Sequence, residues 1–260
     1  MFWISDVDEP IIKVERLSIG YNDKPLMQDL NFFVDRGEVI AILGGSGSGK
    51  STLLKTMIGL IPPIAGTISL AGIDIGSAQD EQRLAALRRI GVMYQSGALF
   101  GSMTLAENIC LPLEEYTDLP RDAMELIARL KLDLVGLEKF ADSLPAEISG
   151  GMQKRAALAR AMALDPAILF LDEPSAGLDP ITAAELDALI LRLKESLEVT
   201  FIVVTHELAS VFTIADRAIM LDASAKGIIA QGTPQDLRDR NDIPIVRRFF
   251  RRQPASLETV

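Results

Sequence analysis

The sequence has a single cysteine, a deficit of basic residues and no long apolar stretch. Its one cysteine, Cys110, excludes an internal disulfide and predicts a core thiol in a reducing compartment. No apolar run is long enough to cross a bilayer, and residues 1–9 lack the basic and apolar parts of a secretory signal. These absences predict a soluble protein of the cytoplasm.

Positive charge is outnumbered, because 26 Lys and Arg residues oppose 36 Asp and Glu residues and give a net charge of −10. So acidic a chain is a poor match for the polyanionic surface of nucleic acid, and we expect no nucleic-acid partner. The 260 residues suit one large domain, or a domain with a subdomain, and 48% hydrophobic residues are enough for a substantial core.

Strand-like and helix-like segments alternate along the chain. Partial alternation between residues 11 and 35 predicts β-structure, and residues 104–145 are rich in helix-like sequence. Continuous apolar runs, separated by helix-like segments such as 183–196, predict parallel strands that are buried on both faces of a sheet. These runs cover residues 39–43, 167–171, 201–204 and 218–221.

The strongest pattern is G-x-x-x-x-G-K-[ST], the P-loop, between the apolar run 39–43 and a helix-like stretch at 52–58. It consists of Gly44, Gly45, Ser46, Gly47, Ser48, Gly49, Lys50, Ser51 and Thr52. The glycines allow successive N–H groups to turn inward and to form, with the helix N-terminus, a concave anion site. Lys50 would reach the β- and γ-phosphates of ATP, and the Ser51 hydroxyl would bind Mg²⁺.

Two other interpretations of this glycine-rich segment fit its surroundings less well. A flexible linker needs neither the Lys50–Ser51 pair nor flanking apolar elements. A dinucleotide-binding fingerprint would use Gly45 and Gly47, but Lys50 stands where its third glycine belongs.

Polar residues also follow two of the other predicted strands. Asp172 and Glu173 come after the run 167–171, and His206 comes after the run 201–204. Because ligands of open α/β sheets bind at the carboxyl ends of the strands, these groups should share one edge with the P-loop. Asp172 would bind Mg²⁺ directly or through water, and Glu173 would polarise the attacking water as general base. The alternative for the acid pair is a solvated strand end with a helix cap.

His206 and Gln95 complete this predicted edge. His206, the one histidine of the chain, would contact the γ-phosphate and orient Glu173 and the water, whereas the alternative is a purely structural histidine. Gln95 follows a shorter apolar run and would reach Mg²⁺ and the water through its amide oxygen. By itself Gln95 would be no more than a polar loop residue.

A second phosphate-binding pattern lies at residues 148–155. Ser149 is a good helix N-cap, and Gly150 and Gly151 expose backbone N–H groups that suit an anion. Since the chain already has one phosphate cradle, we interpret this motif as covering the γ-phosphate that another copy of the chain holds. An ordinary capped helix is the alternative.

With both motifs in place, the chain resembles the nucleotide-binding subunits of ABC transporters over essentially its whole length. Matching motifs follow the family's order: the P-loop, the Q-loop glutamine Gln95, the signature 149–153, Asp172 with Glu173, the D-loop 175–179 and the switch His206. The resemblance assigns further nucleotide-site residues, namely Ser149, Gly150, Gly151, Gln153 and Asp179. It also implies that Tyr21 stacks on adenine, although the sequence alone allows a turn aromatic there.

The resemblance implies a fold and an assembly as well. The fold would be an α/β P-loop NTPase with a parallel-sheet core, an N-terminal antiparallel β-subdomain and a helical subdomain. Residues 1–260 would form one ABC ATPase domain. Its core and β-subdomain would span about 11–95 and 160–235, its helical subdomain about 96–159, and a C-terminal extension about 236–260. Two copies would form a head-to-tail homodimer with two ATP molecules between P-loop and signature.

A narrower resemblance, to the ATPases of Mla- and Mce-type lipid transport systems, rests on residues 94–104, 107–108, 150–155 and 179–182. It implies phospholipid as cargo, a membrane permease and an Mce-domain lipid-binding protein as partners, and a place at the cytoplasmic face of the inner membrane. Leu99 and Phe100 would form an apolar wedge against the permease, or would instead pack into the helical subdomain.

Two other functions and one segment complete the expectations. A non-transport ABC ATPase of translation or DNA maintenance fits poorly with a single P-loop, a short segment between P-loop and signature, and acidic charge. A metabolite kinase would leave residues 149–151 and His206 without a task.

The basic and aromatic segment 246–252 would contact lipid headgroups or a partner, or would be a solvated helix end.

Overall fold

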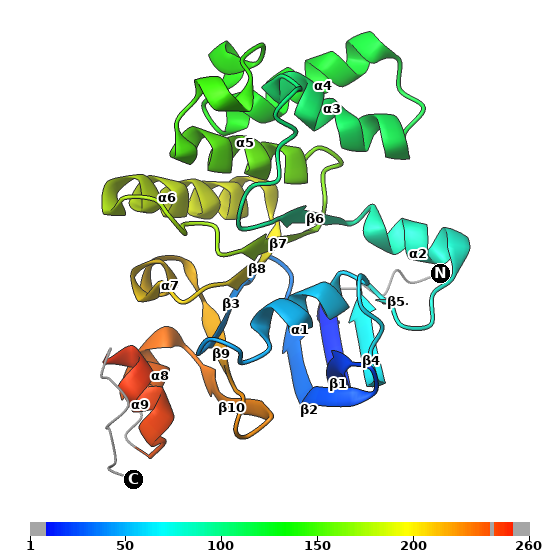
Figure 1. The fold of residues 1–260 in the computed structure, drawn as a ribbon. Coiled ribbons are helices and arrows are strands. Elements are labelled where there is room, and N and C mark those ends of the chain that lie inside the picture. Colours follow the sequence, from blue (N-terminus) through cyan, green and yellow to red (C-terminus); the bar gives the residue numbers. More distant parts are fainter. Residues whose placement is uncertain (1–8, 240–241, 252–260) are drawn as a thin grey trace, which may run out of the picture.

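The computed structural model describes residues 9–239 and 242–251, which form two β-sheets surrounded by helices (Figure 1). The N-terminal sheet is antiparallel, with the strand order β2-β1-β4-β5. Its strands are β1 (Ile12–Tyr21), β2 (Lys24–Val34), β4 (Ala65–Leu70) and β5 (Ile73–Asp74). Buried and exposed residues alternate over much of β1 and β2, because one face of the sheet packs on the core. The structure confirms the predicted N-terminal β-region.

The second sheet has the order β10-β9-β3-β8-β7-β6, in which β10 alone is antiparallel to its neighbour. Its strands are β3 (Val39–Gly44), β6 (Ile90–Met93), β7 (Ile168–Asp172), β8 (Thr200–Val204), β9 (Arg217–Asp222) and β10 (Gly227–Gly232). Every residue of β3 and β8 is buried. Burial on both faces explains why these strands appear in the sequence as continuous apolar runs.

Helices pack on both faces of this sheet. Those between β3 and β6 are α1 (Lys50–Met57) and α2 (Asp80–Leu87). A layer at the top of Figure 1 contains α3 (Leu105–Tyr116), α4 (Arg121–Leu134) and α5 (Gly150–Ala161), with short 3₁₀ turns at Glu138–Phe140 and Pro145–Glu147. The remaining helices are α6 (Pro180–Leu197), α7 (Leu208–Ile214), α8 (Pro234–Asp239) and α9 (Pro244–Phe250). Within the described ranges, no helix combines the length and apolar character needed to span a membrane.

Alternate residues of the central strands belong to different hydrophobic clusters. On β7, Leu169 and Leu171 pack with helices α3 to α6, whereas Ile168 and Phe170 pack with α1 and the antiparallel sheet. A third cluster joins β3 and β9 to α7, α8 and α9. The parallel core, the antiparallel sheet and the helical layer are the fold class expected from the sequence. The numbered division of the chain into subdomains stays a prediction.

Two local expectations can be compared with the structure directly. Cys110 is 1% exposed, and burial raises the pKa of its thiol, as expected of a core residue. The solvated helix end expected within 246–252 is wrong for α9, because Val246 and Phe250 are buried against α7 and α8. Residue 252 lies outside the described residues.

Candidate functional site

The strand order brings four chemically distinct groups to one edge of the parallel sheet. Strands β3, β8, β7 and β6 are successive neighbours, and their carboxyl ends lead into the P-loop, His206, Asp172 with Glu173, and Gln95 respectively. Parallel strands end at the same edge, which is where open α/β sheets bind ligands. The structure therefore brings together the residues that the sequence predicted to meet there.

The P-loop is an open cradle that contains its own lysine. Gly47 and Gly49 have φ angles of +75° and +85°, a conformation that a Cβ atom disfavours. A Cβ atom built on Gly45 or Gly47 would meet nothing within 4 Å, so there is open space beside the loop. The Lys50 ammonium donates hydrogen bonds to the carbonyl oxygens of Gly44 (2.8 Å) and Gly45 (2.9 Å).

This cradle fits a polyphosphate. Burial lowers the pKa of Lys50, while the negative charges of Glu173 and Asp172 act in the opposite direction. The buried Ser48 hydroxyl has no hydrogen-bond partner among the described residues, and Ser51 is exposed in the first turn of α1. An inward-facing ammonium, a free hydroxyl and the N-terminus of a helix are the groups that hold nucleotide phosphates.

Tyr21 lies next to this cradle at the end of β1. Tyr21 is 53% exposed, and its hydroxyl oxygen lies 3.4 Å from the Thr52 hydroxyl oxygen on α1. The ring is thus accessible beside the phosphate site. Its stacking on adenine stays a prediction.

Glu173 is held in a strained turn and is bonded to His206. Its φ angle is +48°, and its N–H donates to the Val204 carbonyl at 2.8 Å. His206 Nδ1 lies 2.8 Å from Glu173 Oε1. Since an ionised carboxylate only accepts hydrogen bonds, Nδ1 carries the proton in this pair. The geometry lets His206 orient the Glu173 carboxylate, while its contact with a γ-phosphate stays a prediction.

Asp172 shares this environment. Burial raises the pKa of its carboxyl group, the charge of Glu173 raises it further, and three lysines act in the opposite direction. The lysines are Lys55, Lys50 and Lys154. Asp172 and Glu173 thus place two negative charges next to each other. A divalent cation bound there would neutralise that charge.

Oxygen donors that suit Mg²⁺ come from the start of α1, the end of β7 and the loop after β6, rather than from one cluster. The predicted ligands are the Ser51 hydroxyl, the Gln95 amide and the Asp172 carboxylate. Among the residues described, no group of three His, Cys, Asp or Glu side chains could hold a metal. Mg²⁺ characteristically uses one or two protein oxygens together with substrate phosphates and water, so this sparse donor set fits a nucleotide-bound metal.

Gln95 begins a loop, residues 95–104, whose two apolar side chains behave differently. Gln95 is exposed, Leu99 packs against the helical cluster, and Phe100 is 56% exposed. Leu99 therefore packs into the helical layer, whereas a contact of Phe100 with a permease stays a prediction.

The sequence pattern did not indicate the residues that hold this loop. Lys154 on α5 donates a hydrogen bond to the Gln95 carbonyl, and Arg160 donates to the carbonyls of Gly97 (2.8 Å) and Ala98 (2.7 Å). The available signal was spacing, because Lys154 stands three residues after the buried Gly151 and therefore on the inner side of the helix.

The signature motif caps α5 as predicted but stays within its own layer. The Ser149 hydroxyl accepts a hydrogen bond from the Met152 N–H at 3.3 Å, and Gly150 is exposed. Gln153 Nε2 donates to the Pro145 carbonyl at 2.9 Å, so this amide supports its own turn and its role in nucleotide binding stays a prediction. Among the described residues, no hydrogen bond joins the motif to the P-loop of the same chain.

Signature and D-loop are neighbours. A Cβ atom built on Gly151 would lie 2.4 Å from Thr182 Cγ2, so only glycine permits this approach of α5 to α6. Asp179 caps α6 by accepting hydrogen bonds from the backbone N–H groups of Ile181 (3.0 Å) and Thr182 (3.1 Å). Ser149, Gly150 and Asp179 are thus exposed parts of one surface.

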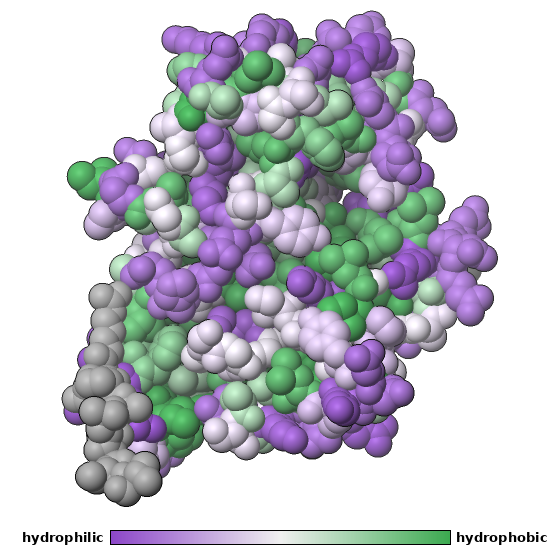
Figure 2. Space-filling view, viewed as in Figure 1, coloured by the Kyte–Doolittle hydropathy of each residue, from purple (hydrophilic) through white to green (hydrophobic). Residues whose placement is uncertain are grey.

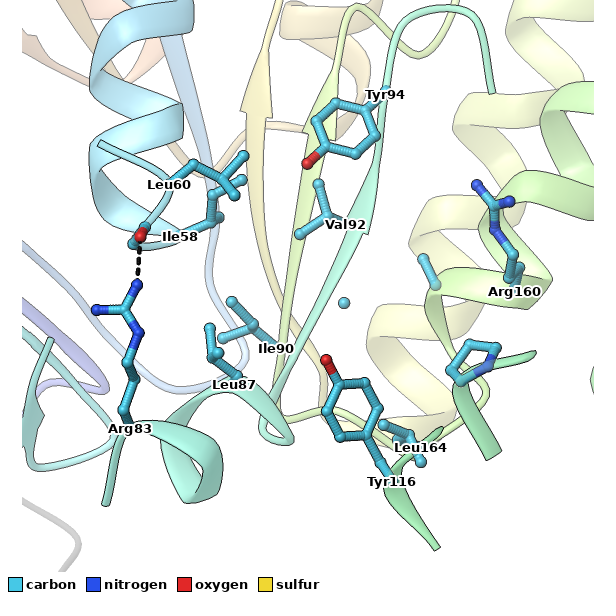
Figure 3. Close-up of a pocket in the computed structure, with 14 residues that line it drawn as sticks. Ile58, Leu60, Arg83, Leu87, Ile90, Val92, Tyr94, Tyr116, Arg160 and Leu164 are labelled. Carbon is cyan, nitrogen blue, oxygen red and sulfur yellow. Dashed lines mark hydrogen bonds between the residues drawn. The ribbon is translucent and has the colours of Figure 1, made fainter. Parts of the chain in front are cut away.

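A hollow of about 320 Å³ opens between the helical layer and the body beneath it (Figure 2). It is lined by residues from the ends of α1 and α2, from β6, and from α3 and α5. Figure 3 shows the hydroxyls of Tyr94 and Tyr116 pointing into it, with Arg160 on one side and Arg83 on the other. Arg83 donates to the Gly59 carbonyl at 2.5 Å. The lining includes no carboxylate.

Comparison with known proteins relates this geometry to a family. Residues 27–176 match the family model described as ABC transporter. The chain is 39% identical over 241 residues to the intermembrane phospholipid transport system ATP-binding protein MlaF of Haemophilus influenzae, covering 93% of this chain and 90% of that protein. It is also 39% identical over 239 residues to the probable ribonucleotide transport ATP-binding protein mkl of Mycobacterium leprae, covering 92% of this chain and 68% of that protein.

A solved structure with the same fold contains ADP and phosphate. It is the dimeric post-hydrolysis state of the ATP-binding cassette MJ0796 bound to ADP and Pi, with a TM-score of 0.76, 28% identity, and coverage of 86% of this chain and 98% of that one. The family match extends over more than half of the chain, and the P-loop and acid pair occupy the expected edge. The chain belongs to the ABC transporter family of ATPases.

Proposed function

We propose that two copies of this chain hydrolyse ATP at shared sites, and that the reaction powers phospholipid transport through a membrane permease. The observation that carries the ATPase mechanism is the carboxyl edge of the sheet, where Glu173 is oriented by His206 beside the P-loop. Phospholipid as cargo is supported by the similarity to MlaF and by residues 94–104.

In the hydrolysis step, a water oxygen bonds to the γ-phosphorus while the bond from that phosphorus to the β,γ-bridging oxygen breaks. Glu173 accepts the proton of the water, and His206 holds the carboxylate in place. The Lys50 ammonium exchanges the Gly44 and Gly45 carbonyls for phosphate oxygens. Ser51, Asp172 and Gln95 would hold Mg²⁺, which would supply charge neutralisation when bound. The products are ADP and phosphate.

A second copy supplies the rest of the site. Ser149, Gly150 and Asp179 are exposed, and Ile181 beside them is 74% exposed. In a head-to-tail homodimer this surface would cover the P-loop of the partner and would place the Ser149 N-terminus of α5 on the γ-phosphate. The Gly151–Thr182 contact would keep signature and D-loop in register.

The change Glu173→Gln tests the base assignment. We expect hydrolysis to slow by about 10²- to 10⁴-fold, because an amide cannot accept the proton, while ATP binding persists and a closed dimer accumulates. Phosphate release and sedimentation velocity with ATP measure these effects. Glu185→Gln, at an exposed position on α6, is the matched control. A wild-type rate for Glu173→Gln would refute the assignment, and a phosphorylated metabolite as product would favour a kinase.

The permease would dock in the hollow beneath the helical layer. Two guanidinium groups, Arg83 and Arg160, border a cavity without carboxylates, and neither forms an ion pair among the described residues. A permease segment with an apolar side chain for the hollow and an Asp or Glu for the arginines would be complementary. Charge reversal at Arg83, Arg83→Glu, should abolish co-purification with the permease, and a Lys substituted for the permease acid should restore it.

The proposed place of the protein follows from that contact. Docked on a permease, and with an Mce-domain protein as a further partner, it would lie on the cytoplasmic face of the inner membrane. Mass spectrometry of lipids co-purified with the intact complex tests the cargo. Enrichment of phospholipid supports the proposal, whereas ATPase stimulation by ribonucleotides without lipid would favour the function named for the mycobacterial relative.

A further inference from the structure

Lys154 carries a buried ammonium that the steps above leave without a task. Lys154 is 8% exposed, and its ammonium donates a hydrogen bond to the backbone carbonyl of Gln95. No ion pair includes it in the part of the chain that the structure describes. Burying a charge with one neutral acceptor is costly. Because the Gln95 carbonyl is that acceptor, the ammonium strongly favours the loop position that keeps this hydrogen bond.

The electrostatic surroundings of Lys154 are those of the candidate site. Burial lowers the pKa of its ammonium, while Glu173 and Asp172 act in the opposite direction. The contact that the ammonium makes is the one with the Gln95 peptide, and the negative charge of the acid pair acts on it there. One side chain thus links the helix that begins at Ser149 to the backbone of Gln95.

Two more hydrogen bonds hold the backbone of the loop after Gln95 against α5. Arg160 donates to the carbonyls of Gly97 and Ala98, which have φ angles of +73° and +51°. A Cβ atom on Gly97 would lie 3.3 Å from Ala157 Cβ, so the loop is packed closely on the helix. The Gln95 side chain itself remains exposed, because the contacts on α5 involve only the loop backbone.

We propose that Lys154 is a positioning residue, which fixes the Gln95 peptide relative to the signature helix so that the Gln95 amide can reach the metal and the attacking water. The inference rests on the proposed roles of Gln95 and of the signature.

The change Lys154→Met removes both donor and charge while keeping an unbranched side chain. We expect kcat for ATP hydrolysis to fall by about 10- to 100-fold, the range for residues that orient metal ligands. The KM for ATP should stay within about twofold, because the P-loop contacts are untouched. Mn²⁺ binding to the ATP-loaded Glu173→Gln protein, measured by electron paramagnetic resonance, should weaken by about tenfold on adding Lys154→Met.

Three variants make the test specific. Lys154→Arg keeps a charged donor and should recover most of kcat and of Mn²⁺ affinity. Lys131→Met is the matched control, because Lys131 is equally buried at 8% and donates to Asp165 in the same helical layer. It should lower thermal stability and leave kcat and Mn²⁺ affinity unchanged. In a Gln95→Ala background, Lys154→Met should add little, because the residue through which it acts is gone.

Defined outcomes overturn the proposal. Wild-type kcat and Mn²⁺ affinity in Lys154→Met would do so, and so would a Lys154→Arg protein as impaired as Lys154→Met. Additive effects with Gln95→Ala would show that Lys154 acts elsewhere. If Lys154→Met does not fold, Lys154→Gln, which keeps a neutral donor, should show the same separation of kcat from KM. A wild-type chain that does not hydrolyse ATP would instead refute the proposed function.

Discussion

Replacing Asn108 should release the loop that follows Gln95. Asn108 lies on α3 with no exposed surface, and its Oδ1 accepts the Phe100 N–H at 2.8 Å. Its Nδ2 donates to the carbonyls of Phe100 (3.1 Å), Met103 (3.2 Å) and Thr104 (3.0 Å). Two amide hydrogens shared by three carbonyls, together with the Oδ1 contact, amount to about three full hydrogen bonds.

The magnitude follows from those contacts. At about 1 kcal/mol net for each hydrogen bond, Asn108→Ala should lower the free energy of opening this loop by about 2 to 4 kcal/mol. Since each 1.4 kcal/mol corresponds to a factor of ten, amide hydrogen exchange in residues 97–104 should accelerate by about 30- to 700-fold. Mass spectrometry of peptides that cover the loop and, separately, β3 measures this effect and shows whether it is local.

Two further variants sharpen the result. Asn108→Asp keeps an acceptor but faces three carbonyls without a donor, so it should open the loop at least as much as Asn108→Ala. Asn31→Ala is the matched control, because Asn31 also makes several hydrogen bonds but is exposed on the antiparallel sheet. Unchanged protection of residues 97–104 in Asn108→Ala would refute the reasoning.

Three other predictions follow from single contacts. Tyr21→Ala should weaken ATP binding by about 1 to 3 kcal/mol, the range for stacking on a base, and Tyr21→Phe should not; equal affinities in a fluorescent-nucleotide titration would exclude stacking. Asp187 is 4% exposed and has one carboxylate oxygen without a partner, and burial raises its pKa against a side-chain hydrogen bond with Ser210. Because the folded pKa lies above the unfolded one, this carboxyl group favours the fold at low pH, and that contribution is lost as pH rises through the folded pKa. In urea unfolding, Asp187→Asn should therefore be more stable than wild type above that pKa and should match it below the unfolded pKa; a gap independent of pH would contradict this. Gly151→Ala would place Cβ 2.4 Å from Thr182 Cγ2 and should weaken the ATP-dependent dimer in sedimentation velocity, whereas an unchanged dimer would show that α5 and α6 can separate freely.

The part of the site that the sequence predicted is the part encoded by short-range pattern. Strands β3, β7 and β8 are buried on both faces, so they appear as apolar runs, and the polar residues after them mark their carboxyl ends. Parallel pairing alone then places the P-loop, Asp172 and His206 at one edge. No long-range contact had to be known for that prediction.

The contacts that escaped prediction join distant parts of the chain. Lys154 and the Gln95 carbonyl are 59 residues apart, and their hydrogen bond depends on how α5 packs beside β6. Backbone carbonyls carry no side-chain pattern, so a sequence cannot show which of them a buried cation will meet. In α9, the arginines drew attention to charge, while the i, i+4 pair Val246 and Phe250 was the signal for burial.

The loop 95–104 therefore connects three surfaces that have different chemistry. Gln95 at its start faces the nucleotide edge, Phe100 is exposed, and α5 beneath it begins at the signature. Arg160 both borders the hollow and donates to the carbonyls of Gly97 and Ala98. A carboxylate that enters the hollow competes with those two carbonyls for the guanidinium, and a charged acceptor binds it more strongly than a neutral one. We therefore expect a carboxylate in the hollow to loosen the hydrogen bonds that hold Gly97 and Ala98 on α5.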